Sequence, residues 1–215
     1  EADRARMAQY VYDLIQWGGP SYARRYLTRL WAVYKKDTPA RGHRATRAVL
    51  DNLARVMAIK DEVYVAHLLT SPEKRRRDRS RYNIDESRGD RLEYVHLNRP
   101  RFTLFGRDIQ FDWRSRDWQL MVMKRLGVLR RLLPAWHRRE REFLEWYEGV
   151  VDGFNLFTDD GAYDLYVEAL SAPAEAKGYR EIRYPKMDAV RSRVEELRAR
   201  WNARVPAGAA RSAQK

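Results

Sequence analysis

The most unusual group of chemically capable residues in the sequence is a run of three charges, Lys60-Asp61-Glu62, followed by Tyr64 and His67. At helical spacing, Lys60, Tyr64 and His67 could line a polar contact with an anionic ligand. Three consecutive side chains cannot share one face of a helix, so at least one charge must point toward the flanking apolar residues. We favour a structural interpretation, in which the cluster supplies a buried or half-buried ion pair that fixes the register of the helix.

Metal and redox chemistry find little support in the sequence. None of the histidines lies three or four residues from another, and HExxH spacing is absent; they are His43, His67, His96 and His137. The absence of cysteine excludes disulfides, iron–sulfur ligation, thiol nucleophiles and thiolate zinc sites. The glycine-rich fingerprints of dinucleotide and P-loop sites and the serine-hydrolase elbow are also missing. The sequence therefore predicts no catalytic, cofactor-binding or metal-binding residue in this chain.

The net charge of +13 is divided unevenly along the sequence. Residues 143–176 contain eight acidic residues and no lysine or arginine, whereas the rest of the chain has 43 basic and 22 acidic residues. A strongly basic chain is a candidate for binding nucleic acid. A separation of charge suits docking against another charged protein surface, or contact between the two regions themselves.

Two basic runs, residues 74–81 and 130–141, are the candidate nucleic-acid footprint. Acidic residues interrupt both runs: Glu73 and Asp78 lie in or beside the first, and Glu140 and Glu142 in or beside the second. We therefore favour a solvated, salt-bridged helix surface, and we keep a basic helical nucleic-acid-binding module as the alternative function.

Hydrophobic periodicity predicts a mainly α fold, with one multi-helix domain over residues 1–205. A helical hairpin is expected over residues 3–36, because Gly18-Gly19-Pro20 divides two apolar-periodic segments. In its second helix, Leu27, Trp31 and Tyr34 broaden the apolar stripe, so two sides of the helix are expected to be covered. Residues 43–69 contain neither proline nor glycine. They predict one long helix that forms the spine of the domain.

The periodicity changes to two at Arg91, which predicts a small antiparallel β-hairpin element over residues 91–112 with a turn near Gly106. Helices are expected again over residues 114–203, the first of them with an apolar face made of Trp118, Val122, Leu126, Leu129 and Leu133. The tail, residues 206–215, is expected to be disordered. No apolar stretch is long enough for a membrane span and no signal peptide is recognisable, so we expect a soluble, cytoplasmic protein.

The segment AIKDEVYVAHLLT, residues 58–70, resembles a signature in the helical region of the indolepyruvate ferredoxin oxidoreductase family, the beta subunit of a 2-oxoacid oxidoreductase. The segments RDWQLMVMKRLGVLRRLLPAWHRRERE and KGYREIRYPKM follow in the order expected for that region, so the resemblance covers most of residues 22–200. Val63 and His67 stand where the common signature has tyrosine and arginine, which places the chain in a divergent branch.

The resemblance implies a function for this chain, in which the sequence predicts no catalytic residue. Enzymes of this family decarboxylate aryl 2-oxo acids oxidatively, and their thiamine diphosphate and iron–sulfur clusters belong to other domains or subunits. No catalytic residue of the family can be assigned to this chain. The resemblance thus implies a non-catalytic structural and interaction domain, whose partners are the catalytic domains or subunit of such an oxidoreductase.

Overall fold

The computed structural model describes residues 1–98, 101–104, 107–110, 113–128, 130, 137–155, 159–178 and 182–204. The chain divides into two compact units. Unit 1 consists of Glu1–Ile59 and His137–Lys215, and unit 2 consists of Lys60–Trp136. The continuous hydrophobic core among the described residues draws on unit 1 alone, and one domain over residues 1–205 stays a prediction.

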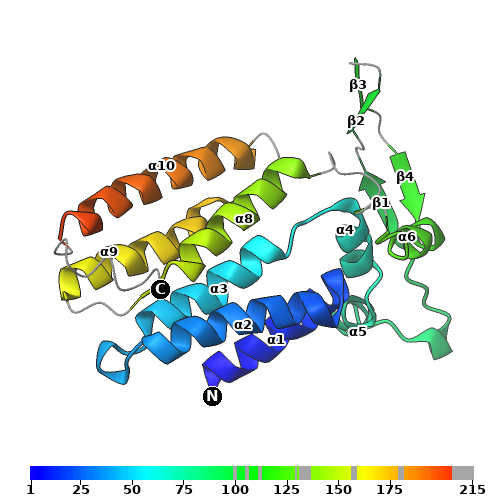
Figure 1. Cartoon of the computed structure of the whole chain (residues 1–215). Helices are drawn as coiled ribbons and strands as arrows, with labels where there is room; N and C mark the ends of the chain where they lie inside the picture. Colours follow the sequence, from blue (N-terminus) through cyan, green and yellow to red (C-terminus); the bar gives the residue numbers. More distant parts are fainter. Residues whose placement is uncertain are drawn as a thin grey trace. The chain divides into compact units, whose positions relative to one another are not determined.

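Unit 1 is a layered bundle of helices (Figure 1). Its α-helices are α1 (Ala2–Gly18), α2 (Pro20–Lys36), α3 (Arg44–Met57), α8 (Arg138–Asp152), α9 (Asp160–Ser171) and α10 (Arg183–Asn202). Two short 3-10 helices, η1 (Pro39–Arg41) and η3 (Ala172–Glu175), join them. The largest fully buried side chains include Tyr26, Phe143, Tyr147 and Phe154, and the hydroxyl groups of Tyr26 and Tyr147 donate to the carbonyl oxygens of Leu50 and Leu170.

The predicted helical hairpin is confirmed by α1 and α2. Gly19 joins them with a φ of 84°, a conformation that favours glycine, and Pro20 occupies the first turn of α2, where its missing N–H costs nothing. The predicted covering of two sides of α2 is wrong, because Leu27, Trp31 and Tyr34 remain exposed. Apolar periodicity predicts which side chains share a face of a helix, but it does not predict whether another element packs against that face.

The single long helix predicted over residues 43–69 is also wrong. It ends at Met57, and a second helix, α4 (Glu62–Leu69), begins after a break. Asp61 precedes α4 as its N-cap, and its carboxylate accepts a hydrogen bond from the backbone N–H of Tyr64 at 2.7 Å. A capping aspartate satisfies an amide that has no partner inside the helix, so a helix can restart here without glycine or proline.

Unit 2 combines short helices with antiparallel strands. Its helices are α4, α5 (Pro72–Arg81), η2 (Glu86–Arg88) and α6 (Asp117–Met123). Strand β1 (Val95–Asn98) pairs with β4 (Trp113–Arg116), and β2 (Arg101–Leu104) pairs with β3 (Arg107–Gln110), so that one ladder continues from the other (Figure 1). The mainly α fold is confirmed. The β element extends beyond residue 112 to Arg116, so the helix expected from residue 114 starts at Asp117.

The last described helix, α10, begins at Arg183 and has Pro185 in its first turn. The predicted disordered tail, residues 206–215, lies outside the described residues. Within the described ranges, no helix combines the length and the apolar composition that crossing a membrane requires.

Candidate functional site

The charged run at residues 60–62 contributes to a buried ion pair through Asp61. Its side chain is 3% exposed, and its two carboxylate oxygens accept hydrogen bonds from Arg130 Nη2 at 2.8 Å and Arg130 Nε at 2.5 Å. The same carboxylate caps α4. Bidentate guanidinium–carboxylate geometry is strong and directional, so Asp61 connects the start of α4 to the segment around Arg130 within unit 2.

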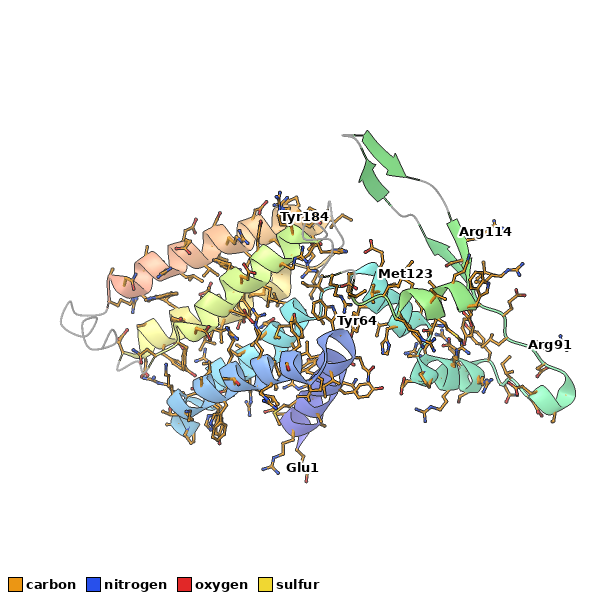
Figure 2. The ribbon with its side chains drawn as sticks, turned by 45° about the vertical axis from the view of Figure 1, so that its right-hand side comes forward. Glu1, Tyr64, Arg91, Arg114, Met123 and Tyr184 are labelled. Carbon is orange, nitrogen blue, oxygen red and sulfur yellow. The ribbon has the colours of Figure 1, made fainter. Side chains whose placement is uncertain are left out.

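The other residues of the predicted cluster do not converge with Asp61 on one pocket. Lys60 is exposed, Glu62 and His67 are half-buried, and Tyr64 is buried. The rings of Tyr64 and His67 are nearly parallel, with centroids 6.3 Å apart, on one face of α4; Figure 2 labels Tyr64. The structure therefore assigns a positioning contact to Asp61 and gathers no ligand-binding group from Lys60, Tyr64 and His67.

The acidic segment, residues 143–176, lies against arginines of the same unit. Six of its eight acidic residues form ion pairs: Glu148 with Arg25 and Arg29, Asp152 with Arg29, Asp160 with Arg41, Asp164 with Arg44, and Glu168 and Glu175 with Arg193. Glu148 is the most buried of them, with a side chain 4% exposed. Of the two arrangements considered for the divided charge, unit 1 has the internal one, in which the basic and acidic regions face each other.

The basic helix α5 is likewise paired within its own unit. Lys74 Nζ lies 2.5 Å from Asp78, and Arg75 Nη2 lies 2.8 Å from Asp117 at the start of α6. The hydroxyl group of Tyr94 donates to Asp78 at 3.2 Å. The hydrogen bond from Lys74 holds the pKa of Asp78 below its ordinary value, and burial raises the pKa of Tyr94. The charged residues of α5 thus connect this helix with Tyr94, which precedes β1, and with the start of α6.

A second buried polar group lies where α8 and α10 begin, close to the labelled Tyr184 in Figure 2. Glu140 Oε1 is 3.3 Å from His137 Nδ1 and accepts a hydrogen bond from Tyr184 at 3.1 Å. Burial raises the pKa of the Glu140 carboxyl, but the hydrogen bond and charge of His137, with the hydroxyl of Tyr184, outweigh burial and leave that pKa below its ordinary value. Burial lowers the pKa of neighbouring Arg183. No group of three or more potential metal ligands occurs in the part of the chain that the structure describes.

Among the described residues of unit 2, several exposed apolar side chains lie on and after α6, which ends at the labelled Met123 in Figure 2. Trp118 is 61% exposed and Val122 is 54% exposed, and Met121, Leu126 and Val128 are exposed beside them. Leu120 is the buried residue of this helix. We call these exposed side chains the α6 face. A hollow of about 560 Å³ borders the face and is lined by Tyr94, Arg91 and Arg116.

The α6 face was predictable from the sequence only in part. Of the predicted apolar stripe, Trp118 and Val122 lie one turn apart on α6, but α6 ends at Met123, before Leu126, and Leu129 and Leu133 lie outside the described residues. The pattern did not reveal that the described part of the stripe is exposed rather than packed in the core. A second feature, a groove beside Trp31 and Tyr34, was missed because α2 was expected to be covered on two sides.

Comparison with known protein families gives a match over most of the chain. Residues 4–196 match the model of a family of unknown function, DUF6537. No curated protein and no solved structure matches the chain. The match spans most of both units and therefore concerns the chain as a whole.

Proposed function

We propose, from the premise that the chain belongs to the DUF6537 family, that it is a non-catalytic structural and interaction domain of an indolepyruvate-oxidoreductase-like enzyme. Such an enzyme decarboxylates aryl 2-oxo acids oxidatively, and this chain contacts its catalytic domains or subunit in the cytoplasm. Thiamine diphosphate and iron–sulfur clusters belong, in this proposal, to those other domains.

The observation that carries the proposal is the exposure of the α6 face. A short helix is ordinarily stabilised by burying its apolar side, yet Trp118 and Val122 of α6 are both more than half exposed. Large contiguous apolar surfaces on soluble proteins mark sites of interaction, and tryptophan, methionine and arginine are enriched where such interfaces carry their binding energy. The face, together with Arg91 and Arg116 at its border, has this composition.

The identity of the partner rests on the resemblance of residues 58–70 and of the segments that follow them. Asp61, in the centre of the resembling segment, makes the contact that holds α4 to Arg130. The segment thus has a structural role in the unit that carries the α6 face, which is consistent with a domain that presents a surface to its neighbours.

A nucleic-acid-binding module is the weaker alternative. The basic residues of α5 that would contact phosphates already lie beside carboxylates, among them Lys74 beside Asp78 and Arg75 beside Asp117. A gel-shift titration at increasing salt distinguishes the two functions, because binding through phosphate contacts weakens steeply with salt. We expect no shift of duplex or single-stranded DNA or RNA at physiological salt.

The test of the proposal uses the full-length gene product. The double variant Trp118→Glu, Val122→Glu places two charges on the α6 face, and we expect it to lose association with the thiamine-diphosphate-binding domain or subunit in size-exclusion chromatography. The variant Tyr12→Glu, at an exposed aromatic residue of α1, is the matched control and should associate normally. Unchanged association in the double variant, or a full-length product with no such catalytic partner, would contradict the proposal.

A further inference from the structure

A groove of about 420 Å³ lies in unit 1 between the start of α1, one side of α2 and the start of α3. Its volume falls within the roughly 300–1,000 Å³ that small-molecule sites occupy. Met7 of α1, Leu30 of α2 and Leu50 of α3 contribute apolar surface to it. The labelled Glu1 in Figure 2 marks the end of α1 that borders the groove.

One wall of the groove is a column of stacked rings. The rings of Trp31 and Tyr34 have centroids 5.4 Å apart, and those of Tyr34 and His43 have centroids 5.0 Å apart, each pair inclined by 25°. Trp31 is 58% exposed and Tyr34 is 44% exposed. Such offset stacks expose ring faces and edges on which a further planar aromatic group can pack.

The groove also carries positive charge. The side chain of Arg4, exposed on α1, forms no ion pair or hydrogen bond with any described residue. Asp3 lies in the same groove, but Arg6 Nη2 at 2.5 Å and Arg47 Nε at 3.1 Å hold its carboxylate. The hydrogen bond from Arg6 keeps the pKa of Asp3 low despite its small desolvation. The guanidinium of Arg4 is therefore available to a ligand in this groove.

His43 adds a polar group to the wall. Its Nδ1 atom is buried and has no hydrogen-bond partner within the described part of the chain. The residue has a φ of 51°, a left-handed conformation that is costly for a residue with a side chain, and it directly precedes α3. Buried polar atoms usually have partners, and strained residues gather at binding sites.

From these contacts we infer that the groove is a binding site for a planar aromatic carboxylate. The ring of the ligand packs against Trp31 and Tyr34, and its carboxylate pairs with the guanidinium of Arg4. The site lies in unit 1, apart from the α6 face, and its existence does not depend on the function proposed above. Binding of a protein partner to the α6 face and binding of a ligand in the groove are thus two separate predictions.

The test is isothermal titration of the full chain with 2-naphthoate as the probe. We expect saturable binding, weakened about tenfold or more by Arg4→Ala through loss of a charge-assisted hydrogen bond, and partly restored in Arg4→Lys. Trp31→Ala should weaken binding about fivefold or more by removing a stacking surface. Trp118→Ala and Arg24→Ala are the matched controls, an exposed tryptophan and an exposed arginine outside the groove, and should bind as the natural chain does.

Two further ligands test the role of the negative charge and the role of the planar ring separately. The neutral 2-naphthamide lacks the charge that Arg4 would recognise, and cyclohexanecarboxylate lacks the planar ring. We expect both to bind at least several-fold more weakly than 2-naphthoate. Equal affinity for naphthoate and naphthamide, unchanged binding by both Arg4→Ala and Trp31→Ala, or no saturable binding at all would overturn the assignment.

Discussion

The two units of this chain are stabilised in different ways. Unit 1 has a continuous core in which large side chains such as Phe143 and Tyr147 are fully buried. In unit 2, the described residues are joined by polar contacts, of which the Asp61–Arg130 and Arg75–Asp117 ion pairs connect segments distant in sequence. Its most conspicuous apolar residues, Trp118 and Val122, are exposed. Unit 1 thus has a buried apolar core beside the exposed rings of Trp31 and Tyr34, whereas in unit 2 the α6 face is exposed.

From this comparison of the two units, we expect the largest loss of stability when a side chain in the core of unit 1 is truncated. Phe143→Ala removes a ring that is 1% exposed and packs beside Trp146, and we expect it to lower the free energy of unfolding by about 3–5 kcal/mol. Urea denaturation followed by circular dichroism measures the change. Trp118→Ala, an equally drastic truncation in unit 2, should change the stability by less than about 0.5 kcal/mol. A loss below about 1 kcal/mol for Phe143→Ala would contradict the assignment of the core.

A somewhat smaller and more local effect is predicted for Asp61. Asp61→Ala removes the cap of α4 and leaves Arg130, whose side chain is 16% exposed, without its carboxylate. We expect a loss of about 3 kcal/mol, confined to unit 2 and measured as faster amide hydrogen exchange in α4 than in α3. The neighbouring Lys60→Ala is the control, because Lys60 is exposed, and should leave exchange unchanged. Equal exchange in both variants would mean that the ion pair does not hold unit 2 together.

Within unit 1, the buried acidic residue should matter more than the exposed ones. Glu148→Gln replaces a carboxylate that is 4% exposed and paired with Arg25 and Arg29, and we expect a loss of about 1–3 kcal/mol in urea denaturation. Asp164→Asn breaks an ion pair with Arg44 in which both side chains are more than half exposed, so its effect should stay within about 0.5 kcal/mol. Similar losses of stability in Glu148→Gln and Asp164→Asn would contradict the greater contribution of the buried carboxylate.

The smallest effect is a pH dependence at Glu140. Its carboxyl has a pKa below the ordinary 4.5 in the folded chain, so it contributes stability that is present above about pH 4.5 and is lost as the pH falls through the lower folded value. Glu140→Gln should remove this component, and the difference in melting temperature between the two proteins should shrink on acidification below pH 4.5. A difference that stays constant down to low pH would contradict the role of His137 and Tyr184 beside this carboxyl.

Local patterns predicted most elements, and tertiary contacts decided the rest. The turn at Gly18-Gly19-Pro20 and the period of two after Arg91 were sufficient to place the α1–α2 hairpin and the strands. The break before α4 was not predictable, because residues 58–61 contain neither glycine nor proline. It depends on Asp61, whose partner Arg130 lies 69 residues further along the chain.

The candidate surfaces were predictable only in part, for the same reason. Helical spacing grouped Trp118 with Val122, and Trp31 with Leu27, but spacing does not determine whether a neighbouring element covers the group. The acidic segment was visible from composition, and its arginine partners, such as Arg25 and Arg193, come from the opposite ends of the chain. Exposure of an apolar face is a property of the assembled fold.

The central claim, that the α6 face contacts another protein region, can be tested by hydroxyl-radical footprinting of the full-length gene product. Trp118 on the α6 face and Trp31 on the groove are almost equally exposed in this chain, at 61% and 58%, so each serves as the reference for the other. We predict that Trp118 is strongly protected from oxidation while Trp31 is modified readily. Equal modification of the two tryptophans would contradict the account.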